Sequence, residues 1–305
     1  MTSRERAVGA LVGLAVGDAV GTTLEFKEPG SFTPITDMVG GGPFRLEPGQ
    51  WTDDTSMAMC LAESILHAGG HDPADQLRRY VAWWRDGYWS STGRCFDIGN
   101  TVSAALRRFE LTGAVTDEPI DDGKAANGSL MRLAPVPIRW HTDLGAAAER
   151  AADSSRTTHP AARPVDACRA YSAMTAGLIQ GRPFDEVLDP DVFRHGPLHR
   201  EIDAVVRGSW RTKSEEEIRG TGFVVDALEA AIWAVAGADD FRTAVLRAAN
   251  LGDDADTTAA IAGQLAGARW GLSGIPGEWR ERITHGRRIE SIAGRLHDHA
   301  TGGTP

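Results

Sequence analysis

The sequence predicts an all-α protein, a single compact orthogonal bundle of many helices. Apolar residues recur at three- and four-residue spacing along most of the 305 residues, which is the periodicity of an amphipathic helix. Alternating apolar and polar runs bounded by turn residues, which would indicate strands, are scarce. Alanine is abundant in the periodic segments, where it favours the helical state and lets helix axes approach closely.

The helical periodicity predicts each element in turn. In chain order the predicted helices are residues 4–20, 54–68, 73–84, 100–110, 144–157, 164–180, 222–235, 240–249 and 256–270. Two of them, 54–68 and 256–270, are alanine-rich and open on clusters of acidic residues. Those two helix starts therefore become the first candidates for a functional site.

The chain reads as one domain, although about 150 residues per domain would allow two. No linker divides it, because the polar stretch 117–124 and the charged stretch 213–219 are short enough to be loops. We expect a single domain over residues 1–300, a flexible tail at 301–305 and disorder at 1–3.

Composition excludes several classes of protein. The formal net charge of −10 disfavours a general nucleic-acid-binding surface, which needs an excess of Lys and Arg. Cys60, Cys95 and Cys168 are widely spaced without a CxxC pair, so we expect no disulfide framework and a cytoplasmic location. No run approaches the roughly 20 uninterrupted apolar residues of a membrane span, so we expect no membrane association.

Two short acidic motifs lie roughly 200 residues apart, Thr52-Asp53-Asp54-Thr55 and Asp253-Asp254-Ala255-Asp256-Thr257. Their carboxylate and hydroxyl oxygens suit Mg²⁺ or Mn²⁺, and neither motif contains the Cys or His that would favour zinc or copper. About four converging aspartates would leave a single divalent ion in a net negative site, which favours a pair of ions. The alternative is that these residues are helix caps, but a cap uses only one or two oxygens.

A third polar segment, Asn127-Gly128-Ser129, precedes an apolar run and offers backbone amides at an expected helix start. Such amides bind phosphate or pyrophosphate groups. Asn-Gly is also a common turn dipeptide, so an ordinary turn is the alternative at this point.

Six motifs taken together resemble the ADP-ribosylglycohydrolase family, and most closely its bacterial, dinitrogenase-reductase-activating type. The resemblance runs from about Ala7 to Trp270. In order, the motifs are residues 13–21 followed by Glu25, Trp51-Thr52-Asp53-Asp54-Thr55, Phe96-Asp97-Ile98-Gly99-Asn100, residues 127–132, Thr158-His159-Pro160 and residues 252–257.

The resemblance implies an all-α fold with two metal ions, Mg²⁺ or Mn²⁺, at the base of a cleft that takes ADP-ribose. The metal ligands that it implies on this chain are Thr52, Asp53, Asp54, Asp254, Asp256 and Thr257. Asp253 falls outside that ligand pattern and is interpreted as a supporting or capping acid, or as a solvated loop acid.

The same resemblance implies the catalytic and binding residues. Asp97 matches a catalytic acid/base, although by itself it would be interpreted as the N-cap of helix 100–110. Glu25 matches a glutamate with a catalytic or gating role in relatives that act on other linkages, and we expect it to be a second catalytic carboxylate beside the metals. The substrate-binding positions that it implies are Asn100, Asn127, Gly128, Ser129, His159 and Phe223, the last in place of a tyrosine that stacks on adenine.

The function implied is metal-dependent hydrolysis of the glycosidic bond at ribose C1″ of ADP-ribosylated substrates, with ADP-ribosyl-arginine on proteins first. Relatives act on ADP-ribosyl-serine, O-acetyl-ADP-ribose or base-linked ADP-ribose, and these remain alternatives. A non-catalytic ADP-ribose-binding relative would have broken ligand motifs, whereas both acidic motifs and Asp97 are intact here. The expected partner is the ADP-ribose moiety of a modified protein, met by a monomeric enzyme.

Overall fold

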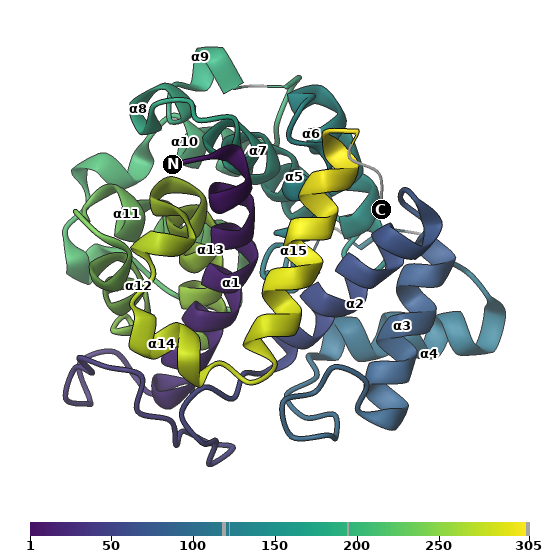
Figure 1. The fold of residues 1–305 in the computed structure, drawn as a ribbon, viewed down its shortest axis with the longest axis horizontal. Helices are drawn as coiled ribbons and strands as arrows, with labels where there is room; N and C mark the ends of the chain where they lie inside the picture. The colour runs from purple at the N-terminus through teal and green to yellow at the C-terminus, as the bar shows by residue number, and fades with distance from the viewer. Residues whose placement is uncertain (118–119, 122, 194, 303–305) are drawn as a thin grey trace.

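A computed structural model describes residues 1–117, 120–121, 123–193 and 195–302, and for residues 192 and 193 it describes the backbone alone. The described residues form helices and two isolated β-bridges, without a strand (Figure 1). The predicted all-α fold class is therefore confirmed.

Each predicted helix is present, with ends within a few residues of the predicted ones. The helices are α1 Ser3–Gly21, α2 Asp53–Ala68, α3 Pro73–Asp86, α4 Asn100–Thr112, α5 Pro135–Trp140, α6 Leu144–Arg156, α7 Ala162–Ile179, α8 Phe184–Val187, α9 Pro190–Phe193, α10 Arg200–Val206, α11 Val224–Ala236, α12 Phe241–Ala249, α13 Ala255–Gly274, α14 Gly277–Arg282 and α15 Gly286–Ala300. Of these, the structure adds α5, α8, α9, α10, α14 and α15, which were not predicted. Short 3-10 turns cover Thr22–Leu24, Ser209–Thr212 and Glu215–Glu217.

Both chain ends differ from expectation. Disorder at residues 1–3 is wrong for Thr2 and Ser3, because Thr2 caps α1 in a reciprocal capping box with Glu5. At the other end, α15 was not predicted, and Thr301 and Gly302 form a turn behind it. The remainder of the expected tail, residues 303–305, lies outside the described residues.

The centre of the fold is a close antiparallel pair, α1 against α13. Glycines at four-residue spacing on α1 face small residues on α13, so the two backbones nearly touch. A Cβ added at Gly13 would lie 2.2 Å from the carbonyl oxygen of Gly263, and one at Gly17 would lie 2.1 Å from that of Ala259. We call this contact the glycine seam, made by Gly9, Gly13, Gly17 and Gly21 of α1 and by Ala255, Ala259, Gly263 and Gly267 of α13.

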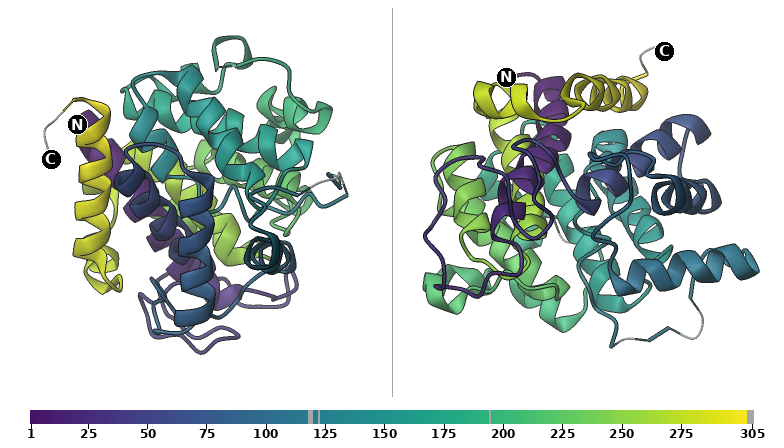
Figure 2. Two further views of the ribbon diagram at one scale, coloured as in Figure 1. Left: turned by 90° about the vertical axis from the view of Figure 1, so that its right-hand side faces the viewer. Right: turned by 90° about the horizontal axis from the view of Figure 1, so that it is seen from below.

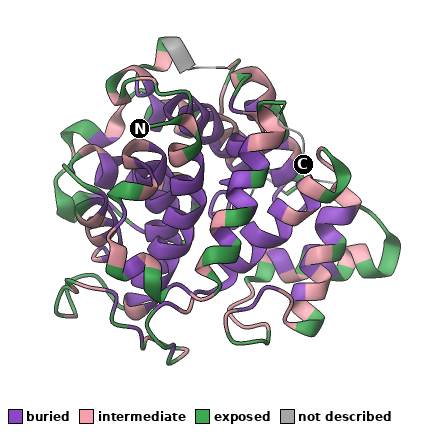
Figure 3. Cartoon of the chain, viewed as in Figure 1, coloured by how far each residue is buried: buried purple, intermediate pink, exposed green. Residues whose placement is uncertain are grey.

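The burial of α1 also explains its composition. Residues Ser3–Leu24 are long and apolar enough to cross a membrane by length and hydropathy alone, a point that the sequence analysis missed. Within the fold, 94% of the most apolar window of that segment is buried. Figure 3 shows α1 and α13 as almost continuously buried ribbons, so α1 is accounted for as the core helix of this bundle.

The remaining helices surround this pair. Helix α15 packs across α1, α2 and α5 and lies between α1 and α2 in Figure 1, while α11 and α12 cover α13. Helix α4 lies at the edge of the molecule, where the right-hand view of Figure 2 shows it extending outward. The arrangement leaves the N-terminal ends of α2, α4 and α13 facing a common cleft.

Candidate active site

A cleft of about 620 Å³ opens where the sequence motifs meet. Its size lies within the range of small-molecule sites. The residues that line it come from segments far apart in the chain: Glu25, Phe26, Asp53, Asp97, Ile98, Gly99, Asn100, Thr101, Val102, Ala126, Asn127, Gly128, Met131, His159, Thr221, Gly222, Asp253, Asp254 and Thr257. The motifs that were singled out in the sequence therefore share one site.

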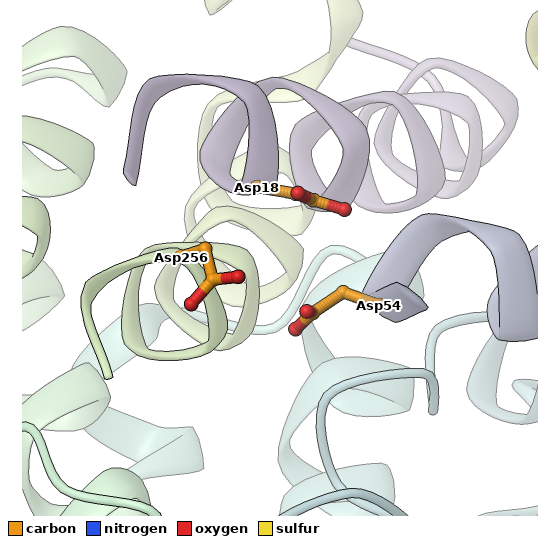
Figure 4. Close-up of side chains that lie close together, drawn as sticks. All are labelled: Asp18, Asp54 and Asp256. Atoms are coloured by element: carbon orange, nitrogen blue, oxygen red, sulfur yellow. The ribbon is translucent and has the colours of Figure 1, made fainter. Parts of the chain in front are cut away.

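Three buried aspartates from three helices meet below this cleft. One carboxylate oxygen from each of Asp18, Asp54 and Asp256 lies within 4.8 Å of the other two. Figure 4 shows them pointing toward one another from α1, α2 and α13. A second group overlaps the first, since Glu25, Asp97 and Asp256 meet the same 4.8 Å criterion. The two distant acidic motifs are thus parts of one carboxylate cluster.

Helix geometry explains how so many carboxylates can gather. Asp53 and Asp54 lie in the first turn of α2, Asp256 lies in the first turn of α13, and the N-terminus of α4 follows Asp97 by three residues. Helix N-termini carry partial positive charge, which stabilises nearby anions. Three such ends at one cleft offset part of the mutual repulsion of the acids.

The alternative interpretation, that the acids are helix caps, does not account for them. Thr52 and Asp254 do occupy the N-cap positions of α2 and α13, but neither side chain accepts a hydrogen bond from a backbone N–H of its own helix. The N-cap of α4 is Gly99, so Asp97 does not cap that helix either. Capping therefore leaves these carboxylates unexplained.

Asp18, which sequence reasoning did not select, takes over the capping of α2. One of its oxygens accepts hydrogen bonds from the Thr52 N–H (2.8 Å) and hydroxyl (3.0 Å), and the other from the Thr55 N–H (3.0 Å) and hydroxyl (2.6 Å). Because α1 supplies the cap, Asp53 and Asp54 are free for other partners. A charged residue inside the apolar run 7–20 was the available signal, because a buried acid needs partners.

Thr52 connects the acids of the cluster. Its hydroxyl lies 3.0 Å from Asp18, 3.1 Å from Asp54 and 3.1 Å from Asp256. A hydroxyl has one proton, so it donates to one of these carboxylates at a time. The others keep their lone pairs for a different partner.

Burial and mutual repulsion make the cluster costly without a cation. Burial, and then repulsion by Asp97, raise the pKa of Glu25 to about 10. Burial, and then repulsion by Asp254, raise the pKa of Asp97 to about 7. Burial raises the pKa of Asp18 to about 6, although its four hydrogen bonds act in the opposite direction. Burial likewise raises the pKa values of Asp53, Asp54, Asp254 and Asp256.

The donor set fits hard divalent cations. Asp54 Oδ1, Asp256 Oδ1 and Glu25 Oε2 are buried oxygens that lack a hydrogen-bond partner. Within the described parts of the chain, no Lys or Arg forms an ion pair with any acid of the cluster. Unpaired carboxylate oxygens in such numbers are the ligands that Mg²⁺ and Mn²⁺ prefer. The clustered acids are therefore able to hold metal.

The backbone around the second motif fixes Glu25 near it. The Phe26 N–H donates to the Asp253 carbonyl (2.7 Å), and the Asp253 N–H donates to the Lys27 carbonyl (2.8 Å). Gly252 has φ +74°, and a Cβ there would lie 2.6 Å from the Lys27 carbonyl oxygen. The backbone of Asp253 thus links the loop that contains Glu25 to the second acidic motif by two hydrogen bonds.

Asn127 and Gly128 line the opposite wall. The Asn127 amide donates to Asp254 at 2.5 Å, and its backbone N–H donates to the Gly222 carbonyl at 3.1 Å. Gly128 lies against the ring of His159, where a Cβ would be 2.9 Å from Cε1. The segment is a turn, so the expectation that it opens a helix is wrong; α5 begins only at Pro135.

Two expected binding residues do not line the cleft. The Ser129 hydroxyl is buried and accepts a hydrogen bond from Ser155 (2.8 Å), so only its backbone is left for a ligand. Phe223 is 36% exposed beside the lining residue Gly222, with the guanidinium of Arg163 5.9 Å above its ring. Asn100 and His159, by contrast, both line the cleft.

Comparison with known proteins adds independent information. The family model for ADP-ribosylglycohydrolase matches residues 1–304. The "ADP-ribosylarginine hydrolase Tri1" of Pseudomonas putida is 46% identical over 97% of this chain and 79% of that protein. The "ADP-ribosyl-[dinitrogen reductase] glycohydrolase" of Rhodospirillum rubrum is 33% identical over 92% of this chain and 90% of that protein. A solved "ADP-ribosylglycohydrolase-related protein complex" superposes with a TM-score of 0.86 at 38% identity, covering 98% of this chain and 99% of that one.

Proposed function

The chain belongs to the ADP-ribosylglycohydrolase family, and from that premise we propose that it hydrolyses the N-glycosidic bond of ADP-ribosyl-arginine on proteins. The observation that carries the proposal is the single cleft in which Asp97 and both acidic motifs meet. The choice of arginine rests on the similarity to a protein named for ADP-ribosylarginine, at 46% identity over nearly the whole chain.

The proposed metal ligands are Thr52, Asp53, Asp54, Asp254, Asp256 and Thr257. In support, Asp53, Asp254 and Thr257 line the cleft, Asp54 and Asp256 belong to the carboxylate cluster, and the Thr52 hydroxyl lies 3.1 Å from both of these last two. Two Mg²⁺ or Mn²⁺ ions there would supply positive charge that neutralises the acids, orients ribose hydroxyls and acidifies water. Asp18 then has a structural part, because its hydrogen bonds fix the start of α2 on which three of the ligands lie.

Asp97 is proposed as the general base and acid. It lines the cleft, and one of its carboxylate oxygens lies within 4.8 Å of an oxygen of Glu25 and of Asp256, so it is positioned to exchange a proton with a group bound there. In the reaction water attacks C1″ of the ribose while the bond from C1″ to the guanidine nitrogen breaks. Asp97 takes a proton from that water and delivers one to the departing nitrogen, so that arginine and ADP-ribose leave. Glu25, 3% exposed, is the second carboxylate at the reacting end.

The remaining cleft residues are proposed to bind the ADP-ribose moiety. Asn100 at the start of α4, the backbone from Asn127 to Ser129 and the ring of His159 would surround the ribose and diphosphate. Phe223 is proposed to stack on adenine at the cleft edge, and its partial exposure beside the lining residue Gly222 supports this role. We propose as well a single domain over residues 1–300, a monomeric state and a cytoplasmic location.

Hydrolysis of defined substrates tests this function. Arginine-, serine- and base-linked ADP-ribose and O-acetyl-ADP-ribose are each incubated with the enzyme in Mg²⁺, Mn²⁺ or EDTA, and free ADP-ribose is measured. We expect release from the arginine linkage with metal, and none with EDTA or with Asp256→Ala. Preferred release from another linkage would replace arginine as the substrate. Tight ADP-ribose binding without any hydrolysis would show a non-catalytic relative.

A further inference from the structure

Arg132 is a buried cation without an anionic partner. Its side chain is 0% exposed, and among the described residues no carboxylate forms an ion pair with it. Its Nη1 donates to the Gly128 carbonyl (3.1 Å), and its Nη2 donates to the Ser154 carbonyl (3.3 Å) and to the Thr158 hydroxyl (2.8 Å). A buried charge is costly, so its position needs a reason beyond packing.

Part of that reason lies in helix α6. Ser154 is in the last turn of α6, whose C-terminal carbonyls carry partial negative charge. The guanidinium also lies over the ring of Tyr80, with 4.8 Å from Cζ to the ring centroid. These contacts compensate the charge without a carboxylate, and they hold Arg132 directly behind the Gly128 wall of the cleft.

Hydrogen-bond roles then follow along a short chain of groups. A guanidinium only donates, so the Thr158 oxygen must accept from Arg132. In the described structure, Nδ1 of His159, at 2.7 Å, is the one acceptor within reach of the Thr158 hydroxyl proton. A buried hydroxyl proton without an acceptor is costly, so this arrangement favours donation from Thr158 to Nδ1, which leaves that nitrogen without a proton of its own.

The imidazole of His159 is neutral, because burial and then the charge of Arg132 lower its pKa to about 3. A neutral ring with an accepting Nδ1 carries its single proton on Nε2. His159 lines the cleft, and a Cβ at Gly128 would lie 3.1 Å from Nε2. Of the groups that the structure describes, none forms a hydrogen bond with Nε2, which is left for a ligand.

We propose that Arg132 and Thr158 are positioning residues that hold His159 as the Nε2–H tautomer, so that it donates a hydrogen bond to an oxygen of bound ADP-ribose. The inference rests on the proposed function for its ligand, although the hydrogen-bond chain exists in the free protein. It explains why a cation is buried at this place, and why a residue without a side chain, Gly128, lies against the ring.

The tautomer is measured first, in the ligand-free full-length protein labelled with ¹⁵N-histidine. Long-range ¹H–¹⁵N spectra distinguish a protonated Nε2 from a protonated Nδ1, with His159→Phe used for assignment. We expect a neutral His159 ring with the proton on Nε2 and a hydrogen-bonded, accepting Nδ1. A proton on Nδ1, or a charged ring at neutral pH, would overturn the proposal.

The effect on the ligand is measured by calorimetry with ADP-ribose in Mn²⁺. Thr158→Val removes the hydroxyl at nearly constant volume, and we expect affinity to fall about 10-fold, the value of one ordinary hydrogen bond. Thr158→Ser should restore it. The matched control is Thr157→Val, because the Thr157 hydroxyl also lies near Arg132 (3.5 Å) but contacts Gln76 instead of His159. Equal losses in Thr157→Val and Thr158→Val would overturn the proposal.

A double-mutant cycle separates positioning from general structure. If Thr158 acts through His159, Thr158→Val should have no further effect on ADP-ribose affinity in the His159→Phe background, whereas additive losses contradict the chain. Melting curves confirm that each variant is folded. Failure of the proposed function would give a different result. If the protein has the Nε2–H tautomer and binds ADP-ribose but does not hydrolyse ADP-ribosyl-arginine, the proposed reaction is wrong and the proposed hydrogen-bond chain stands.

Discussion

Three non-glycine residues at the cleft adopt the left-handed backbone conformation, Phe26 (φ 60°), Asp97 (φ 58°) and Asp253 (φ 52°). This conformation is uncommon for residues with a Cβ, and it concentrates at functional sites. Two of the three are held by the paired backbone hydrogen bonds between the Glu25 loop and the second acidic motif. The backbone strain of these three residues therefore lies at the cleft that they line.

At Asp97 the expected consequence of substitution is chemical. Asp97→Asn keeps the side-chain shape and removes the proton-transfer group, so we expect turnover of ADP-ribosyl-arginine to fall by about 10²- to 10⁴-fold. ADP-ribose affinity, measured by calorimetry, should stay near the wild-type value. Unchanged turnover would remove Asp97 from the mechanism, and Glu25→Gln would become the next variant to measure.

At Phe223 the expected consequence concerns binding. Replacement by Ala removes the ring proposed to stack on adenine, so ADP-ribose affinity should weaken by about 1–3 kcal/mol. Phe223→Tyr preserves the ring and is the control, which should bind ADP-ribose like wild type. Ribose 5-phosphate lacks adenine, so wild type, Phe223→Ala and Phe223→Tyr should all bind it equally well. An unaltered ADP-ribose affinity in Phe223→Ala would locate adenine elsewhere.

At the scale of the elements, the glycine seam sets how far apart α1 and α13 lie. Gly13→Ala would place a methyl group 2.2 Å from the Gly263 carbonyl oxygen, so the helices must separate. The free energy of unfolding should drop by about 1–3 kcal/mol or more, although alanine is the better helix former. Denaturant unfolding measures the change.

Gly70→Ala is the control for the seam, because a Cβ there meets nothing within 4 Å. Its free energy of unfolding should stay within about 0.5 kcal/mol of wild type. Equal stability of Gly13→Ala and wild type would mean that the two helices can move apart without loss.

The elements that the sequence predicted are those with long, regular apolar periodicity. Helix α15 was not predicted, although its buried residues Ile289, Ile292, Ala293 and Leu296 have helical spacing. The segment is rich in arginine and other polar residues, which makes this spacing less evident in the sequence. Short helices such as α5 and α8 contain too few residues for a periodic signal. Those elements exist because neighbouring helices bury them.

The site was predictable where several polar residues lie close together in the chain, as in the two acidic motifs. The roles of Asp18 and Arg132 were not predictable in this way. Each is a single charged residue within a mainly apolar stretch, and its hydrogen-bond partners come from distant segments. Nothing local in the sequence states that Asp18 caps α2 or that Arg132 faces the end of α6. Only the packing of the helices brings those partners together.

For the molecule as a whole, the metal-free carboxylate cluster opposes folding as pH rises. Folding raises the pKa values of Asp18, Asp97 and Glu25 to about 6, 7 and 10, so the folded state keeps protons that the unfolded chain releases above about pH 4. Stability in EDTA should therefore fall between about pH 5.5 and pH 8. We expect the melting temperature to drop by roughly 5 °C or more, because one kcal/mol corresponds to about 2 °C in a chain of this size.

With Mn²⁺ the melting temperature should instead rise as the pH increases. Metal ions compete with protons for the same carboxylate oxygens and bind more tightly at higher pH. Asp256→Asn is the control, since it removes one of the clustered carboxylates and should reduce both the fall in EDTA and the gain with Mn²⁺. A melting temperature in EDTA that rises toward pH 8 would contradict the assigned shifts.

The glycine seam also has a bearing on biosynthesis. Helix α1 is synthesised long before α13, the helix that covers it, because α13 begins only at Ala255. For most of translation the nascent chain therefore displays a bare apolar segment, one that resembles a bilayer-spanning sequence in length and hydropathy. The carboxylate cluster is likewise incomplete until Asp256 has been synthesised. We therefore expect the core of this enzyme to form only after α13 has been synthesised, and the apolar α1 segment to need protection from aggregation until then.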